Sequence, residues 1–158
     1  MKKNIFIILI FFICAGCSSV NLKNRKISKY FTLKEAIYSN TAEKNRIKNI
    51  PNNIEYNNIT YTAKRMDEVR KALKTKIYVT SWFRNKKVNK KVNGSKRSYH
   101  QKGLAVDFKI KGNAKYIKRK LDKAKVSYDQ LIYYSKQNRV HISFKKSKKY
   151  ERKQYFIR

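Results

Sequence analysis

The chain has 158 residues, and its 41 lysines and arginines against 9 acidic residues give a formal net charge of +32. Hydrophobic residues make up 41% and aromatic residues 13%, which excludes a wholly disordered chain, while 4 glycines and 1 proline exclude collagen-like and linker-like chains. The length fits one domain, and the charge predicts attraction to nucleic acid, anionic lipid or anionic cell-wall polymer. Because the lysines are spread along the chain, as AT-rich coding also produces, charge alone does not identify the partner.

The first residues have the pattern of an export signal. Two lysines precede an apolar run over residues 5–15, which is shorter than the roughly 20 residues that span a bilayer as a helix. Small residues stand just before Cys17 and resemble a bacterial lipobox, in which the cysteine becomes acylated. We predict a lipoprotein signal peptide over 1–16, a lipid on Cys17 and a basic tether over 17–29. An uncleaved membrane anchor is the alternative.

Export also bears on the cysteines and on the partner. Cys14 would leave with the signal peptide and Cys17 would carry lipid, so no disulfide is expected although the exported compartment permits one. The predicted location is the membrane surface that faces the periplasm or cell wall. Nucleic acid is a less expected partner at that location than lipid or cell-wall polymer.

The next segments predict helices. Thr32–Glu35 has the spacing of a capping box and predicts a short helix, and residues 39–53 read as a loop. Residues 60–74 predict an amphipathic helix packed on the core. Its apolar residues recur at helical spacing: Ala63, Met66, Val69 and Leu73.

The rest of the chain predicts strands with one helix between them. Residues 84–97 read as a basic loop, and Asn113 is placed to cap a helix that carries Ile117 and Leu121. β-Branched and aromatic residues predict strands over 76–83, 103–110, 128–134 and 139–144. This order predicts an α+β domain with a mainly antiparallel sheet.

Three side chains have the composition of a metal site. Asp107 and His141 each lie in the middle of a strand, opposite a row of apolar residues, so both point to the non-core face if the strands are neighbours. His100 precedes its strand by a turn at Gly103 and can fold back toward that face. Two imidazoles and a carboxylate form a typical catalytic zinc set. The alternative is two unrelated surface histidines and an aspartate paired with a lysine.

The segment "SYHQKGLAVDF" matches Ser-x-His-x-x-Gly-x-Ala-x-Asp, and the chain resembles the zinc D-alanyl-D-alanine carboxypeptidase family. That family includes phage endolysin peptidases and shares its fold with the Hedgehog signalling domain. Other segments are similar to its conserved runs: "SNTAEKNRIKNIPNN", "VTSWFRNKKVNKKVNGSKRS", "YDQLIYY" and "VHISF". The resemblance implies one α+β domain of the Hedgehog and DD-peptidase type over 30–146, with residues 147–158 as a basic C-terminal tail.

The resemblance also implies roles for individual residues. His100, Asp107 and His141 would be the ligands of one Zn²⁺. Arg84 would meet a substrate carboxylate or carbonyl oxygen, and Ser98 would support the site or touch the substrate. The substrate would be a peptidoglycan stem peptide, cut by a carboxypeptidase or endopeptidase reaction.

The general base departs from the family pattern. In relatives a glutamate commonly follows the "DQLIY" segment, or an acid stands three residues before the second histidine. Here those positions hold Tyr134 and Asn138. The catalytic candidates are therefore Tyr134, which offers a phenol, and Asp129, the nearest carboxylate.

A hairpin turn at "SKQN" argues against Asp129. That turn sets Tyr134 opposite Arg139 and Ile132 opposite His141, which leaves Asp129 near the end of the next strand with its side chain on the other face. A phenol, with an intrinsic pKa of about 10, is a poor proton acceptor at neutral pH.

Two other hypotheses compete with a lipid-anchored zinc peptidase. The missing carboxylate favours a weak or inactive, zinc-holding lipoprotein that binds the cell wall. A basic nucleic-acid binder is supported by charge alone, because no helix-turn-helix, zinc-finger spacing or aromatic nucleic-acid signature is present. We expect a monomer whose positive charge helps it adhere to anionic wall polymer or lipid head groups.

Overall fold

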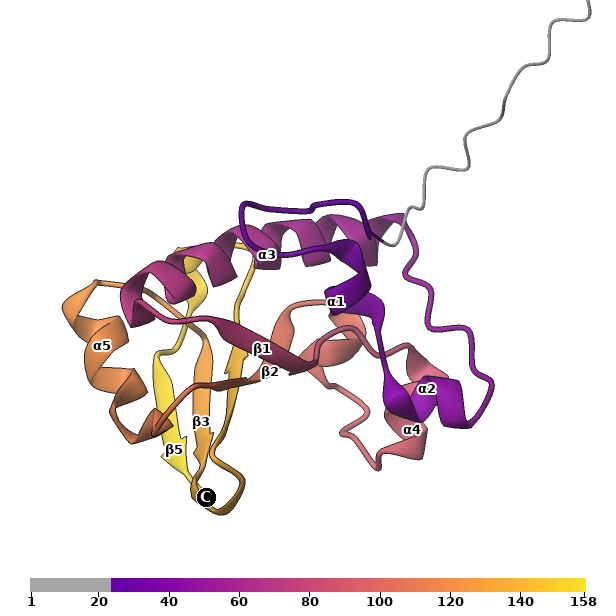
Figure 1. Ribbon diagram of the computed structural model, residues 1–158. Coiled ribbons are helices and arrows are strands. Elements are labelled where there is room, and N and C mark those ends of the chain that lie inside the picture. The colour runs from indigo at the N-terminus through magenta and orange to yellow at the C-terminus, as the bar shows by residue number, and fades with distance from the viewer. Residues whose placement is uncertain (1–23) are drawn as a thin grey trace, which may run out of the picture.

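The computed structural model describes residues 24–158, which form an α+β fold, as predicted (Figure 1). The predicted signal peptide, Cys17 and the start of the tether lie outside the described residues. The helices are α1 (Leu33–Ile37), α2 (Asn40–Lys44), α3 (Asn53–Leu73), α4 (Lys86–Lys91) and α5 (Ile117–Lys123). The strands are β1 (Ile77–Ser81), β2 (Ala105–Ile110), β3 (Gln130–Tyr134), β4 (Arg139–Ser143) and β5 (Gln154–Ile157).

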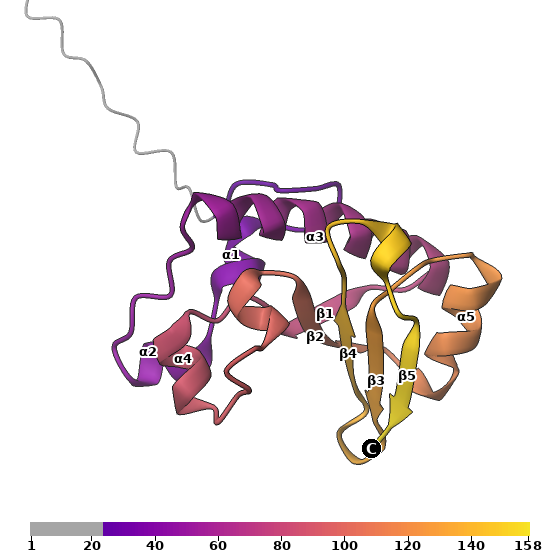
Figure 2. The ribbon, with the colours of Figure 1, turned by 180° about the vertical axis from the view of Figure 1, so that it is seen from behind.

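The strands form one five-stranded sheet in the order β1-β2-β4-β3-β5. The pairs β1–β2, β2–β4 and β3–β4 are antiparallel, and β5 runs parallel to β3. Figures 1 and 2 show α3 running along the sheet, with α5 near its C-terminal end and α2 and α4 on the side of its other end. The sheet is thus mainly antiparallel, and the four strands predicted from the sequence are all present.

The hydrophobic core lies between α3 and one face of the sheet. The buried apolar residues of α3 share one cluster with those of the strands, and burial of each large side chain contributes roughly 1.5–3 kcal/mol. On the helix these are Ile59, Ala63, Met66, Val69 and Leu73, and on the two central strands Val106, Phe108, Val140 and Ile142. Because these strand residues point toward α3, the alternate residues of β2 and β4 point to the opposite face.

Helix α3 starts earlier than its apolar spacing predicts. The helix was expected over 60–74 and begins at Asn53, because Asn52 and Glu55 form a reciprocal capping box. The added residues carry the exposed side chain of Ile54, and they also add Ile59, which extends the buried apolar stripe. At the other end Lys74 adopts a left-handed conformation and closes the helix.

Two short helices lie in segments that the sequence predicted to be loops. α2 begins after Ser39, whose side chain caps it, and α4 begins after Asn85, which does the same. Each is only one or two turns long, with Ala42 or Val88 as its sole buried apolar residue. A single anchored residue produces no hydrophobic period, so these helices have no signal beyond their caps.

Residues of the expected tether and of the expected C-terminal tail pack against the rest of the fold. Within the expected tether, Ile27 is buried in the core and Ser28 donates a hydrogen bond to Asp67 Oδ1 at 2.9 Å. Within the expected C-terminal tail, β5 pairs with β3. Residues on both sides of the expected boundaries at 30 and 146 therefore make contacts with distant parts of the chain. Across residues 24–158, no helix is long and apolar enough to cross a membrane.

Candidate metal centre

His100, Asp107 and His141 meet on the sheet face that points away from α3. One ligand atom from each residue lies within 4.8 Å of the other two. Asp107 on β2 and His141 on β4 are direct partners across the antiparallel pair, so their side chains project side by side. His100 reaches them from a 3₁₀ turn over Tyr99–Lys102. The structure thus brings together the three residues predicted to bind metal.

The turn before β2 orients His100. Its Nδ1 lies 2.7 Å from the carbonyl oxygen of Trp82, and its backbone N–H donates to Ser98 Oγ at 3.3 Å. A carbonyl only accepts, so Nδ1 carries the proton and Nε2 presents a lone pair to the cluster. Gly103 ends the turn with φ +72°, and a Cβ there would lie 2.7 Å from Ile59 Cγ1. Glycine is therefore required where the turn meets α3.

The distances between ligand atoms fit a tetrahedral zinc site. His141 Nδ1 lies 2.8 Å from Asp107 Oδ1 and 3.2 Å from His100 Nε2, and His100 Nε2 lies 3.3 Å from Asp107 Oδ1. Ligands about 2.0–2.1 Å from zinc at tetrahedral angles lie about 3.3 Å from one another. Two nitrogens and one anionic oxygen at this spacing form a donor set that zinc accepts.

The electrostatic environment keeps the ligands in their metal-binding forms. Burial lowers the pKa of His100, so its imidazole is neutral at pH 7. Burial alone would raise the pKa of Asp107, but its interactions with His100 and His141 outweigh this and hold the pKa well below the usual value. A neutral imidazole and an ionised carboxylate are the states that coordinate zinc.

Two arginines contact the Asp107 carboxylate oxygen that faces away from the histidines. Arg84 donates to Asp107 Oδ2 at 2.7 Å, and Arg139 lies 3.1 Å from the same atom. Arg84 also donates through Nε to Ser81 Oγ at 2.7 Å, which fixes its direction. Oδ1 is thereby left to the ligand cluster. These contacts place Arg84, a predicted substrate-binding residue, at the edge of the metal centre.

The two candidates for the general base lie in different places. Tyr134 follows the strand parity of Ile132, which pairs with His141, and its ring lies 3.9 Å from the guanidinium carbon of Arg139. Asp129 has the opposite parity, is fully buried and accepts hydrogen bonds from Arg152 at 2.6 and 2.9 Å. The structure therefore does not bring Asp129 to the metal centre, and the predicted hairpin register is confirmed.

The remaining acidic residues do not supply a second carboxylate at the centre. All nine lie among the described residues, and the one metal-compatible group found there contains only Asp107. Seven others are engaged elsewhere in caps, ion pairs or hydrogen bonds, and Glu43 is exposed on α2. The engaged residues are Glu35, Glu55, Asp67, Glu68, Asp122, Asp129 and Glu151. Asn138, which stands three residues before His141, bonds to the backbone of Ala114 and Gly112.

Sequence reasoning missed the role of Arg139. It stands two residues before His141 on the same strand, so strand parity places it on the same face. The alternation that predicts the direction of His141 therefore predicts that of Arg139 as well. Ser81 was missed as well, because its contact with Arg84 closes a turn that has no periodic signal.

The comparisons with known proteins agree with the geometry. A family model described as Peptidase M15 matches residues 29–143. This range includes His100, Asp107, His141 and Arg84. No curated protein matches the chain.

Proposed function

The chain belongs to the M15 peptidase family, and on that premise we propose that it is a zinc-dependent peptidase that hydrolyses peptidoglycan stem peptides. The observation that carries the proposal is the convergence of His100, Asp107 and His141 at distances that suit tetrahedral zinc. The alternative reading, two surface histidines and a lysine-paired aspartate, does not explain why three ligand atoms face one point.

In this proposal the chain holds the metal and positions the substrate. His100 Nε2, Asp107 Oδ1 and His141 Nδ1 would hold the ion, and zinc, when bound, supplies Lewis acidity to a peptide carbonyl and activates water. Arg84 and Arg139 place two positive charges beside the ligands, where a stem-peptide carboxylate or a developing oxyanion is stabilised.

Proton transfer is the weak point of this mechanism. Peptide hydrolysis needs a group that accepts a proton from water and returns it to the leaving amine. Tyr134 is the side chain near Arg139 that replaces the carboxylate of relatives. A phenol accepts protons poorly at neutral pH, so the proposed enzyme is slow.

The shortage of carboxylates favours a second candidate function. Asp107 is the only one of the nine acidic residues in the metal cluster, and it is held by two arginines. A chain with this composition can retain zinc and bind the cell wall without hydrolysing it. This function is a zinc-holding, wall-binding protein with weak or no turnover.

One experiment separates the two functions. The purified full-length chain is loaded with zinc and incubated with muropeptides that carry an intact stem, and its zinc content and products are measured by mass spectrometry. The peptidase proposal expects slow, zinc-dependent cleavage that is lost in His100→Ala. The mass of the product identifies a carboxypeptidase, which releases D-alanine, or an endopeptidase, which cuts the cross-link or another stem bond. Bound zinc without cleavage supports the second function, and the absence of both contradicts the metal centre itself.

We also propose that the chain is an exported lipoprotein anchored through Cys17. The support is the basic start, the short apolar run and the small residues before that cysteine. Expression in a bacterial host with a labelled fatty acid should give a labelled, membrane-associated chain. Cys17→Ser should abolish labelling, with Cys14→Ser as the matched control; equal labelling of both variants would contradict the assignment.

A further inference from the structure

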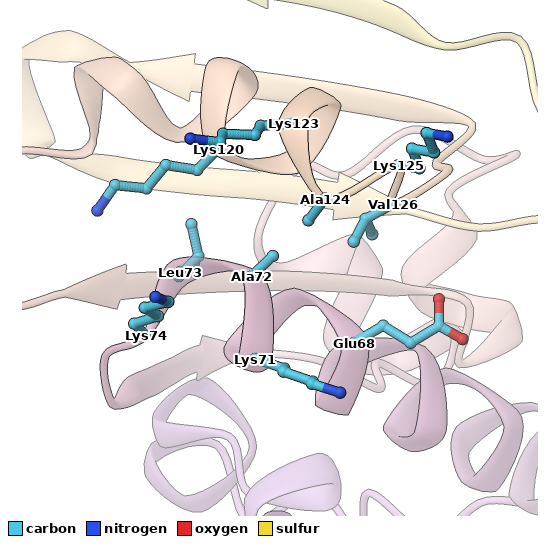
Figure 3. A pocket seen from close by; sticks show the side chains of 10 residues that line it. All are labelled: Glu68, Lys71, Ala72, Leu73, Lys74, Lys120, Lys123, Ala124, Lys125 and Val126. Atoms are coloured by element: carbon cyan, nitrogen blue, oxygen red, sulfur yellow. The ribbon is translucent and has the colours of Figure 1, made fainter.

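A groove lies between the C-terminal end of α3 and the end of α5, and none of its lining residues belongs to the metal centre. Its volume is about 730 Å³. Figure 3 shows Ala72 and Leu73 of α3 pointing across the groove toward Ala124 and Val126 of the facing segment. Leu73 and Val126 are buried, so the floor is apolar and formed by the core itself.

Lysines surround this floor. Five exposed lysines line the groove: Lys71, Lys74, Lys120, Lys123 and Lys125. Within residues 24–158, none of them forms an ion pair. The one acidic residue of the lining, Glu68, is already paired with Arg65 and Lys148. The rim therefore carries positive charge that the described chain does not neutralise.

Helix-end electrostatics explain part of this arrangement. α3 and α5 both end at the groove, and lysines near a helix C-terminus interact favourably with the helix dipole. That effect does not require the two helix ends to lie side by side. It also does not account for Lys125, which follows the end of α5, or for the hollow between the lysines.

The basic path continues beyond the groove. A second hollow shares Lys125 and Val126 with it and adds Tyr128 and Lys153. The acidic residue of that hollow, Asp122, is paired with Lys118. The positive surface is thus elongated, and an elongated surface suits a linear chain of charges better than a single head group.

We propose that this groove binds a linear phosphodiester polymer with a small polyol repeat, of the kind found as anionic polymer in cell walls. The groove contains lysine but no arginine, and the compact ammonium group of lysine is a common phosphate ligand, whereas arginine is favoured for planar, bidentate pairing. The apolar floor packs against the carbon atoms of the polyol between phosphates. This binding site is independent of zinc and of peptide hydrolysis.

The test compares two triple variants that lose the same charge. The groove variant carries Lys71→Gln, Lys120→Gln and Lys123→Gln. The control variant carries Lys64→Gln, Lys90→Gln and Lys91→Gln, which likewise change one exposed lysine on α3 and two on a short helix. Binding of a synthetic glycerol-phosphate polymer to the zinc-loaded full-length chain is measured as a function of salt.

The proposal expects a difference between these variants. The groove variant should bind the polymer about tenfold or more weakly at about 0.15 M salt, and the slope of log K against log salt should fall by about 2. The control should change by less than about threefold, and both variants should keep the wild-type zinc content and melting temperature. Equal weakening of the two variants would assign binding to overall charge and overturn the proposal.

Lipid vesicles test whether the ligand of the groove is a membrane surface instead of a polymer. Vesicles rich in phosphatidylglycerol present the same phosphodiester on a membrane surface. If the groove variant loses vesicle binding while neither variant changes polymer binding, the ligand is a lipid surface and the proposal fails. Groove-dependent polymer binding with equal vesicle binding by both variants supports the proposal.

Discussion

At the residue scale, the two oxygens of Asp107 have separate roles. Oδ1 faces the two histidines, and Oδ2 is held by Arg84 and Arg139. The arginines fix the orientation of the carboxylate, because rotation would break the hydrogen bond from Arg84 and the ion pair with Arg139. Outer partners of this kind typically change metal affinity 10–100-fold when removed. The same two arginines add positive charge beside the centre and bind its one carboxylate, so Asp107 is not free to act as a base.

Tyr134→Glu should increase peptide hydrolysis. A carboxylate at this strand position would face the metal centre beside Arg139 and accept a proton at neutral pH, which a phenol does poorly. General-base catalysis is typically worth about 10²–10⁴-fold, so we expect a rise in kcat of at least about tenfold with unchanged zinc content. Cleavage of a muropeptide is the measurement. The control is Tyr150→Glu, at an exposed tyrosine, and a similar rate in both variants would exclude Tyr134 as the missing base position.

Gly103→Ala should destabilise the fold and weaken zinc binding. The added Cβ would lie 2.7 Å from Ile59 Cγ1 and 3.0 Å from the Glu55 carbonyl oxygen, at a φ of +72°. Backbone strain of this kind costs about 1–3 kcal/mol, and the clash with α3 adds to it. Displacing the turn also displaces His100.

The matched control for this variant is Gly112→Ala. Gly112 has φ +84°, but a Cβ there meets nothing within 4 Å. Chemical denaturation of Gly112→Ala should therefore show only the destabilisation that backbone strain causes. Zinc titration should show the wild-type affinity. Equal zinc affinity in the two variants would show that the turn at Gly103 does not position His100.

At the element scale, the last segment of the chain is held by buried charges. Arg65 on α3 pairs with Glu151 at 3.0 Å and donates to the carbonyl of Ser127. The next residue, Arg152, binds the buried Asp129, which directly precedes β3. These contacts place the following residues beside β3, so that β5 pairs with it at the edge of the sheet. A strand that lacks a clear hydrophobic period thus forms because its entry is fixed by ion pairs.

Asp129→Asn should destabilise the protein at neutral pH but not in acid. Burial raises the pKa of Asp129, but hydrogen bonds and charge from Arg152 and Lys145 outweigh it and lower the pKa below its ordinary value. The ionised carboxylate therefore contributes to folding stability above the unfolded-state pKa of about 3.9. This contribution is lost as pH falls through the lower folded-state pKa.

We expect Asp129→Asn to lower the free energy of unfolding by about 1–3 kcal/mol at pH 7, with the difference shrinking below about pH 4. Urea denaturation across pH is the measurement. Asp122→Asn, at an exposed aspartate paired with Lys118, should change stability by less than about 1 kcal/mol. A loss for Asp129→Asn that persists unchanged into acid would contradict the ionised pair.

At the scale of the whole molecule, zinc should stabilise the fold. The three ligands come from a turn and two strands that are assembled only when the domain is folded, so the unfolded chain does not present them together. Binding at 1,000 times the dissociation constant adds about 4 kcal/mol, which raises the melting temperature by roughly 10 °C for a domain of this size. Calorimetry with zinc and with a chelator measures the shift. Asp107→Asn should remove it, and a full shift in that variant would place the bound zinc elsewhere.

Some of the fold was predictable because it depends on neighbours in sequence. The capping box at Thr32 and Glu35, the apolar stripe of α3 and the alternation in β2 and β4 each lie within a few residues, and each is present. The helices at α2 and α4 were missed because one buried residue sets no period. Strand β5 was missed because its partners lie more than twenty residues away.

The sequence by itself identified the three candidate ligand residues and the face on which two of them lie, because strand alternation and a short motif are local properties. It also determined that the usual carboxylate positions hold Tyr134 and Asn138. Only the tertiary structure decided that Arg139 and Arg84 both bind Asp107, and that Arg152 binds Asp129. It alone also brings lysines of α3 and α5 to the same groove. Each of these is a contact between segments distant in the chain, and packing, rather than any local pattern, brings them together.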